Sequence, residues 1–119
     1  MTTKQVADRF YQLAQQGQWD DIQNELFSQD AVSIEPEGTP WGTVKGLDAI
    51  REKGRQFAAM FEEMHSGWCT EPQVGGNYFS VAMGMDVTMK DQGRVNMDEV
   101  CVYQVKDGKI VSEQFFYNE

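Results

Sequence analysis

The sequence predicts an α+β domain in which three N-terminal helices pack on one face of a curved, mostly antiparallel sheet. Apolar residues recur at three- and four-residue spacing in the first half of the chain and alternate with polar ones in much of the second half. The clearest element is the last hairpin, where β-branched and aromatic residues flank Asp107-Gly108, a pair suited to a tight turn. With 119 residues, the chain is expected to form a single domain, residues 1–119.

Three segments have the pattern of amphipathic helices. The first spans residues 3–16 and is ended by Gly17. The second is shorter, and its apolar face contains Trp19, Ile22, Leu26 and Phe27. The third begins at Leu47 and runs to about residue 60. We expect these helices to precede most of the sheet.

The strands are predicted from alternation and from turn residues. A short strand at residues 30–36 is closed by Pro36, and a loop follows at residues 37–46. Strand-like runs then occupy about 64–74, 77–90, 94–106 and 109–118, separated by Gly-, Asn- and Asp-containing turns. Neighbours linked by hairpins make the sheet mostly antiparallel.

Charge and composition exclude several partners. The formal net charge is −9 and the ten Lys and Arg residues are scattered, so we expect no nucleic acid and no anionic membrane surface as partner. No signal peptide or membrane-spanning run is visible, and we expect a cytoplasmic protein. Cys69 and Cys101 are interpreted as buried, reduced thiols. His65 is the single histidine, so we expect no metal site.

A resemblance to a known superfamily covers nearly the whole chain. It is carried by Gly17-Gln18-Trp19-Asp20, the strand from Asp30 to Pro36, Gly46-Leu47-Asp48-Ala49-Ile50-Arg51 and Asp107-Gly108-Lys109-Ile110. These segments resemble the nuclear transport factor 2-like superfamily, whose cone-shaped fold encloses a pocket between sheet and helices. Residues 97–100 and 113–117 resemble its SnoaL-like branch. The resemblance implies no particular reaction, because this scaffold serves isomerases, cyclases, dehydratases and binding proteins.

The ketosteroid isomerases of this superfamily suggest catalytic positions. Their base is a carboxylate before the proline that ends the first strand, which corresponds to Glu35. Their second carboxylic acid corresponds to Asp98. Their tyrosine on the first helix corresponds to Phe10, which has no hydroxyl, and Tyr11 is turned about 100° away around the helix. This departure counts against steroid isomerase activity itself and leaves a pocket with two carboxylates as the expectation.

The chemistry of such a pocket gives roles to three residues. A carboxylate at the mouth of an apolar pocket can act as general base toward a proton beside a carbonyl, and Glu35 suits that role. Asp98 and His65 would polarise or protonate the oxygen. Each has a structural alternative: Glu35 as a solvated strand end, Asp98 as a hydrogen-bond partner of a neighbouring strand, and His65 as a packing residue.

The alternation of polar and apolar residues does not decide which face of the sheet borders the pocket. In one register, the pocket is lined by Asp86, Asp98, Glu113, Phe115 and Tyr117, together with Phe10. Trp41 then caps this pocket. The outer face then carries Met83, Met85, Val87, Met89, Cys101 and Tyr103, and would form a homodimer interface. In the other register, the methionines belong to the core and the polar row meets solvent. Trp19 and Trp68 are expected in the core.

The function predicted at this level is a pocket for a small apolar, carbonyl-bearing molecule. As an enzyme, the protein would perform isomerisation, cyclisation or dehydration without a cofactor. The alternative is a non-catalytic ligand-binding or dimeric interaction module, which the missing hydroxyl at Phe10 favours somewhat.

Overall fold

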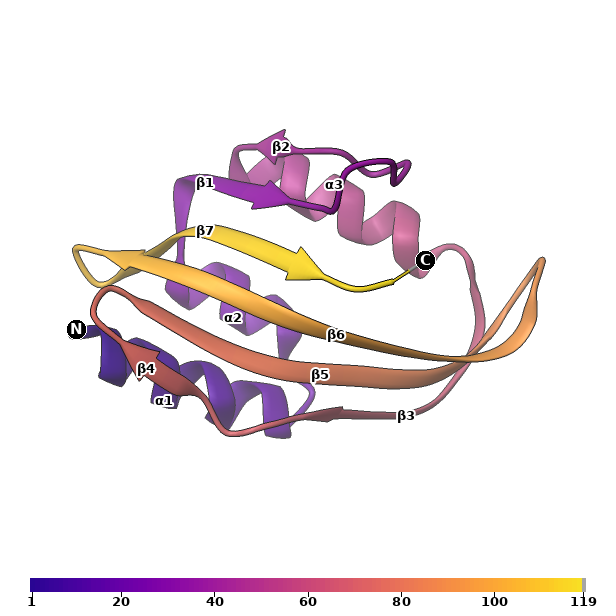
Figure 1. Cartoon of the computed structure of the whole chain (residues 1–119), viewed down its shortest axis with the longest axis horizontal. Helices are drawn as coiled ribbons and strands as arrows, with labels where there is room; N and C mark the ends of the chain where they lie inside the picture. The colour runs from indigo at the N-terminus through magenta and orange to yellow at the C-terminus, as the bar shows by residue number, and fades with distance from the viewer. Residues whose placement is uncertain (119) are drawn as a thin grey trace.

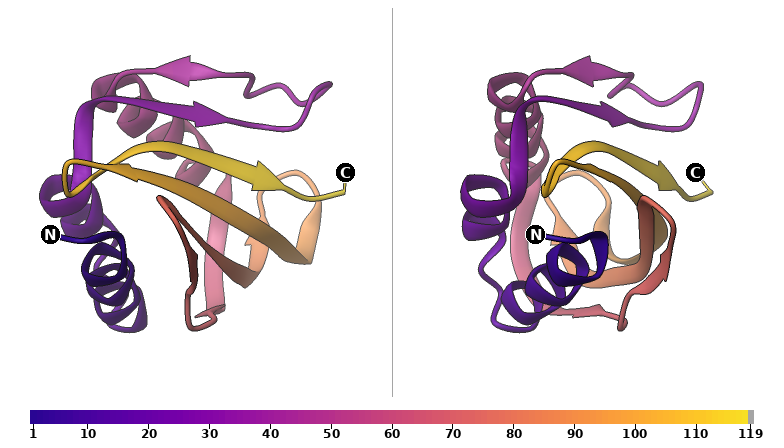
Figure 2. Two further views of the ribbon diagram at one scale, coloured as in Figure 1. Left: turned by 60° about the vertical axis from the view of Figure 1, so that its left-hand side comes forward. Right: turned by 90° about the vertical axis from the view of Figure 1, so that its left-hand side faces the viewer.

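The computed structural model describes residues 1–118 and has the predicted α+β architecture. Three helices, α1 (Thr3–Gln15), α2 (Trp19–Leu26) and α3 (Leu47–Ala58), lie on the same side of one sheet (Figures 1 and 2). Helix α1 begins with a capping box, in which Thr2 and Gln5 exchange hydrogen bonds between side chain and backbone. The positive φ of Gly17 then allows the chain to turn into α2.

Seven strands form a single mixed sheet. They are β1 (Phe27–Ile34), β2 (Val44–Lys45), β3 (Phe61–Cys69), β4 (Gln73–Gly75), β5 (Tyr78–Met89), β6 (Gly93–Lys106) and β7 (Lys109–Phe116). The order is β2-β1-β7-β6-β5-β3, and β4 pairs with the end of β5. All pairs are antiparallel except β1 with β7. Figure 2 shows the long strands bending around the helices.

The differences from the sequence prediction concern element ends and two short strands, β2 and β4. Strand β1 starts at Phe27, directly after α2, and a bulge separates its first residue from the regular part. The predicted run 64–74 is two strands, β3 and β4, because the chain turns between Cys69 and Gln73. The short strand β2 lies within the predicted loop 37–46. At the last turn, Asp107 and Gly108 both have positive φ, as the hairpin prediction requires.

The register of the sheet decides which side chains meet the helices. Phe79, Val81, Val87 and Met89 of β5 and Cys101, Tyr103 and Val105 of β6 are buried. Because alternate residues share a face, Met83 and Met85 also point toward the helices. The homodimer argument from an outward methionine row is therefore wrong, and the alternative, a methionine row in the interior, is confirmed. The polar row with Gly84, Asp86 and Thr88 lies on the outer face.

Candidate functional site

An inner cavity of about 330 Å³ lies between the helices and the sheet. Its walls come from the α1–α2 junction, α3, β3, β5 and β6: Ala14, Gln15, Gly17, Trp19, Phe57, Met64, Gly67, Trp68, Cys69, Met83, Gly84, Met85, Met97 and Glu99. Trp19 and Met64 are 45 % and 52 % exposed, so they stand at its mouth. Such a volume is within the range of small-molecule sites.

Glu99 is the carboxylate in this otherwise largely apolar lining. It stands on β6 opposite Met83 of β5, in the row that also contains Met97 and Cys101. Burial, together with the neighbouring Glu35 and Glu113 carboxylates, raises the pKa of Glu99 to about 7. The Cys101 thiol donates a hydrogen bond to Glu99 Oε1 at 3.6 Å, and this hydrogen bond lowers the pKa of Glu99. Glu99 is therefore able to exchange a proton near neutral pH.

A buried polar network surrounds Lys53 of α3. Lys53 Nζ donates to Ser33 Oγ at 2.5 Å and to Glu35 Oε2 at 3.2 Å, and the Tyr117 hydroxyl donates to Glu35 Oε1 at 2.7 Å. The Lys53 and Glu35 side chains are only 13 % and 9 % exposed. Hydrogen bonding and ion pairing of this kind offset the desolvation of both charges. Glu35 is thus held in a fixed geometry.

Glu113 of β7 is the second carboxylate with a shifted pKa. It is 7 % exposed and points to the same side of the sheet as its β6 neighbour Tyr103. Burial raises the pKa of Glu113 to about 7, while a hydrogen bond with Ser33 and the charge of Lys53 lower it. Glu35, Glu99 and Glu113 therefore share the interior with one ammonium group, that of Lys53.

The predicted pocket residues divide between the two faces. Glu113 and Phe115 point inward as expected, and the Phe115 ring lies 5.3 Å from Lys53 Nζ. Asp98 is exposed and shares the outer face with its β5 neighbour Gly84. Asp86 lies on that same outer face, where Arg94 donates to both its oxygens. Placing Asp98 and Asp86 in the pocket was wrong, because a shift of one residue reverses the face.

His65 is also separate from the cavity. Its Nε2 lies 2.7 Å from Thr88 Oγ1 and its Nδ1 lies 3.2 Å from Glu63 Oε2. Thr88 belongs to the outer polar row of β5, so His65 does not meet Glu35. The predicted convergence of Glu35, Asp98 and His65 in one cavity is wrong.

The aromatic predictions also change. Phe10 is buried in the core against Phe79 and Tyr103, at centroid distances of 5.4 Å and 4.8 Å, and is not part of the cavity wall. Trp41 packs edge-on against Phe57, which itself lines the cavity, but Trp41 is not part of the cavity wall. Trp19 lies at the cavity mouth and not in the core.

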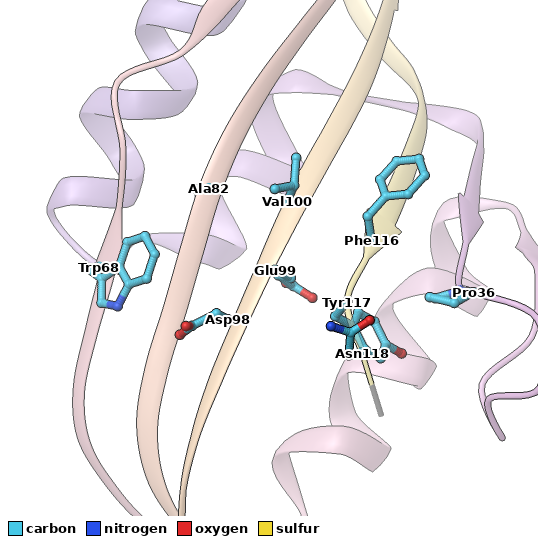
Figure 3. A pocket seen from close by; sticks show the side chains of 9 residues that line it. All are labelled: Pro36, Trp68, Ala82, Asp98, Glu99, Val100, Phe116, Tyr117 and Asn118. Carbon is cyan, nitrogen blue, oxygen red and sulfur yellow. The ribbon is translucent and has the colours of Figure 1, made fainter.

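The outer face of the sheet carries a second, shallow groove of about 550 Å³ (Figure 3). Trp68, Val100 and Phe116 are 49 %, 46 % and 48 % exposed in its lining. Trp68 lies over Gly84, where an added Cβ would be 2.7 Å from the indole ring. In Figure 3, the side chains of Asp98 and Glu99 leave neighbouring positions of β6 in different directions. Trp68 is thus a surface residue, contrary to the prediction.

Residues 1–118 contain neither a metal-binding cluster nor a membrane-spanning helix. No three His, Cys, Asp or Glu side chains among them are arranged to hold a metal ion. None of the helices in this part of the chain has the length and apolar character needed to cross a membrane.

Comparison with known families identifies the domain. The family model described as a SnoaL-like domain matches residues 1–117. The chain belongs to the SnoaL-like domain family. A comparison with curated proteins found no match.

Solved structures agree with this assignment. A candidate SnoaL-like polyketide cyclase from Mesorhizobium loti, also described as a carbohydrate phosphatase, is 36 % identical with a TM-score of 0.92. The match covers 98 % of this SnoaL-like chain and all of the other. A nuclear transport factor 2-like protein from Burkholderia thailandensis is 17 % identical, with a TM-score of 0.82 and coverage of 99 % and 92 %. TerC, co-crystallised with polyporic acid, is 18 % identical, with a TM-score of 0.75 and coverage of 98 % and 91 %.

The residue of this SnoaL-like domain to which sequence reasoning gave no site role is Glu99. The signal was present in the sequence, because Val95, Met97, Cys101, Tyr103 and Val105 form an alternating apolar row that includes position 99. A carboxylate inside such a row is the exception that marks a candidate site.

Proposed function

We propose that this SnoaL-like protein binds a small apolar, carbonyl-bearing molecule in the inner cavity and transfers a proton on it without a cofactor. The observation that carries the proposal is Glu99, a carboxylate in an apolar cavity wall with a pKa raised to about 7 by burial. A general base is most effective when its pKa is close to the working pH. The reaction classes are isomerisation, cyclisation and dehydration.

The proposed chemistry uses groups of the cavity wall. The Glu99 carboxylate takes a carbon-bound proton beside the carbonyl, and the electron pair of the C–H bond moves to the carbonyl oxygen as an enolate. Gln15 and Trp19 bring side-chain N–H groups to the lining, and these are the candidates to stabilise the enolate oxygen. Glu99 then returns its proton to a different atom or to the leaving oxygen.

Glu35, the base expected from the sequence, has a supporting role in this proposal. Its two oxygens are engaged by Lys53 and Tyr117, and it is not part of the cavity wall. Each Glu35 oxygen thus already accepts a hydrogen bond within the network. We propose that Glu35 holds Lys53 in place, and that Glu99 performs the proton transfer.

The proposal is tested by hydrogen exchange on ketone probes. Wild-type protein is expected to speed the exchange of α-protons of small aryl ketones with deuterated water, followed by proton NMR. Glu99→Gln keeps the shape and loses the base, so exchange should fall to the buffer rate. Asp98→Asn, one residue along on the outer face, is the matched control and should exchange like wild type. Equal exchange by wild type and Glu99→Gln would refute the catalytic role.

A binding module without turnover is the second candidate. The observation that favours it is Phe10, which fills the core where the ketosteroid isomerases place a hydroxyl donor. In that case, ketone probes would bind the cavity and exchange no faster than in buffer.

We also propose that the protein forms a homodimer through its outer sheet face. The support comes from Trp68, Val100 and Phe116, which form a half-exposed apolar patch around the outer groove. A second copy of the same face would cover this patch and leave the inner cavity open to ligand. The expected state in sedimentation at micromolar concentration is a dimer.

A further inference from the structure

The inner cavity has an unbalanced set of charges in its wall. Among the residues the structure describes, its ionisable lining groups are Glu99 and Cys69, with no Lys, Arg or His. Burial raises the pKa of Cys69 to about 11, so the thiol is neutral at physiological pH. The charge presented to a ligand in the wall is therefore that of one carboxylate.

The ammonium group of Lys53 lies near this wall but contacts other residues. Lys53 Nζ donates to Ser33 Oγ and pairs with Glu35, on the β1 side of the interior. The groups that act on Glu99 are Glu35, directly after β1, Glu113 of β7 and the Cys101 thiol of its own strand. Three carboxylates thus face one ammonium group, and that ammonium group is not in the cavity lining.

From this arrangement we infer that the cavity selects its ligands by charge, admitting neutral and cationic molecules and excluding carboxylates and phosphate esters. The inference rests on the proposed function, because it assigns a substrate class to the same site. A neutral carbonyl compound can approach Glu99 without repulsion. An ammonium group can pair with Glu99 while Trp19 and Phe57 contact its apolar part. The cavity lining offers an anion no positively charged side chain.

The size of the effect follows from simple electrostatics. Two like charges about 6 Å apart, at an effective dielectric constant of about 20, change a dissociation constant by roughly a hundredfold. The penalty requires an ionised Glu99. Since the pKa of Glu99 is about 7, discrimination against anions should grow as the pH rises from about 6 to about 8.

The experiment compares three naphthalene probes of matched size. They are 2-acetylnaphthalene, which is neutral, 2-naphthoate, which is an anion, and 2-(aminomethyl)naphthalene, which is a cation. Dissociation constants are measured by calorimetry on the wild-type protein at about pH 6 and about pH 8. Glu99→Gln and the outer-face control Asp98→Asn are measured in the same way.

At about pH 8, roughly a tenth of the molecules still carry a protonated Glu99 that binds an anion without repulsion, so we expect naphthoate to bind roughly tenfold more weakly than the ketone. The amine should bind at least as tightly as the ketone. The ratio of the naphthoate dissociation constant to the ketone dissociation constant should fall severalfold at about pH 6 and in Glu99→Gln. The same ratio should be unchanged in Asp98→Asn. Naphthoate binding within about threefold of the ketone at the higher pH would overturn the inference. So would a ratio that Glu99→Gln leaves unchanged, or failure of all three probes to bind.

These outcomes are separable from the proposed catalysis. Ketone exchange that depends on Glu99, together with tight naphthoate binding, would overturn charge selection and leave the proton-transfer proposal standing. Exclusion of naphthoate without any ketone exchange would support charge selection and favour the binding module. Wild-type measurements at two pH values keep the inference testable if Glu99→Gln does not fold.

Discussion

Replacing the buried Glu113 by glutamine should change how the stability of the protein depends on pH. Burial raises the pKa of Glu113 to about 7, and its folded-state partners are Ser33 and the charge of Lys53. Glutamine has nearly the same shape and still offers a carbonyl oxygen to the Ser33 hydroxyl. The substitution therefore removes the titration with little change in packing.

The expected magnitude follows from proton linkage. An unfolded glutamate has a pKa of about 4.3, whereas Glu113 in the folded protein has a pKa of about 7. Between these values the folded state holds a proton that the unfolded state has released, so the free energy of unfolding falls as the pH rises. The stabilisation is complete below about pH 4 and lost above about pH 7, and amounts to roughly 3 to 4 kcal/mol.

The assay is urea unfolding of wild type and Glu113→Gln at about pH 5 and about pH 8. The free energy of unfolding of the variant, relative to wild type, should rise by up to about 3 kcal/mol between the two values. Glu37→Gln, at an exposed position, is the control that removes a carboxylate from the surface. A difference between wild type and Glu113→Gln that is the same at both pH values would refute the argument.

Three other changes have defined outcomes. Lys53→Met leaves the interior carboxylates without their cation, so the free energy of unfolding, measured with urea, should fall by about 3 kcal/mol at about pH 8. The decrease should be smaller at about pH 5, and equal decreases at the two pH values would contradict this. Gly84→Ala should displace the indole of Trp68, seen as a shift in tryptophan fluorescence, with roughly 1 to 3 kcal/mol lost; an unchanged spectrum and stability would contradict the contact. Val100→Glu, on the outer face, should give a monomer in sedimentation; a dimer would contradict the proposed interface.

The fold was predictable because its signals are local and repeated. The helices follow from three- and four-residue apolar spacing, and the last hairpin follows from Asp107-Gly108 between two alternating strands. The parallel pairing of β1 with β7 was not predictable in this way, since it joins segments about 80 residues apart with no turn between them. Short elements such as β2 leave no periodic signal at all.

The site was harder to predict because it depends on one residue of register. Counting along the ketosteroid isomerase resemblance led to Asp98, whereas the apolar alternation of β6 places Glu99 in the interior. Glu113 and Phe115 were assigned to the correct face, since they pair with buried residues of β6. The Lys53 network escaped prediction because it joins α3 to β1 and β7 through side-chain contacts that no spacing encodes.

Glu99 is expected to gain and lose its proton near neutral pH inside an apolar cavity. Carbon-13 NMR of the glutamate carboxyl groups, with the Glu99 signal assigned by comparison with Glu99→Gln, measures this titration. We expect a titration midpoint of about 7 for Glu99. A midpoint at the ordinary glutamate value of about 4.3 would contradict it.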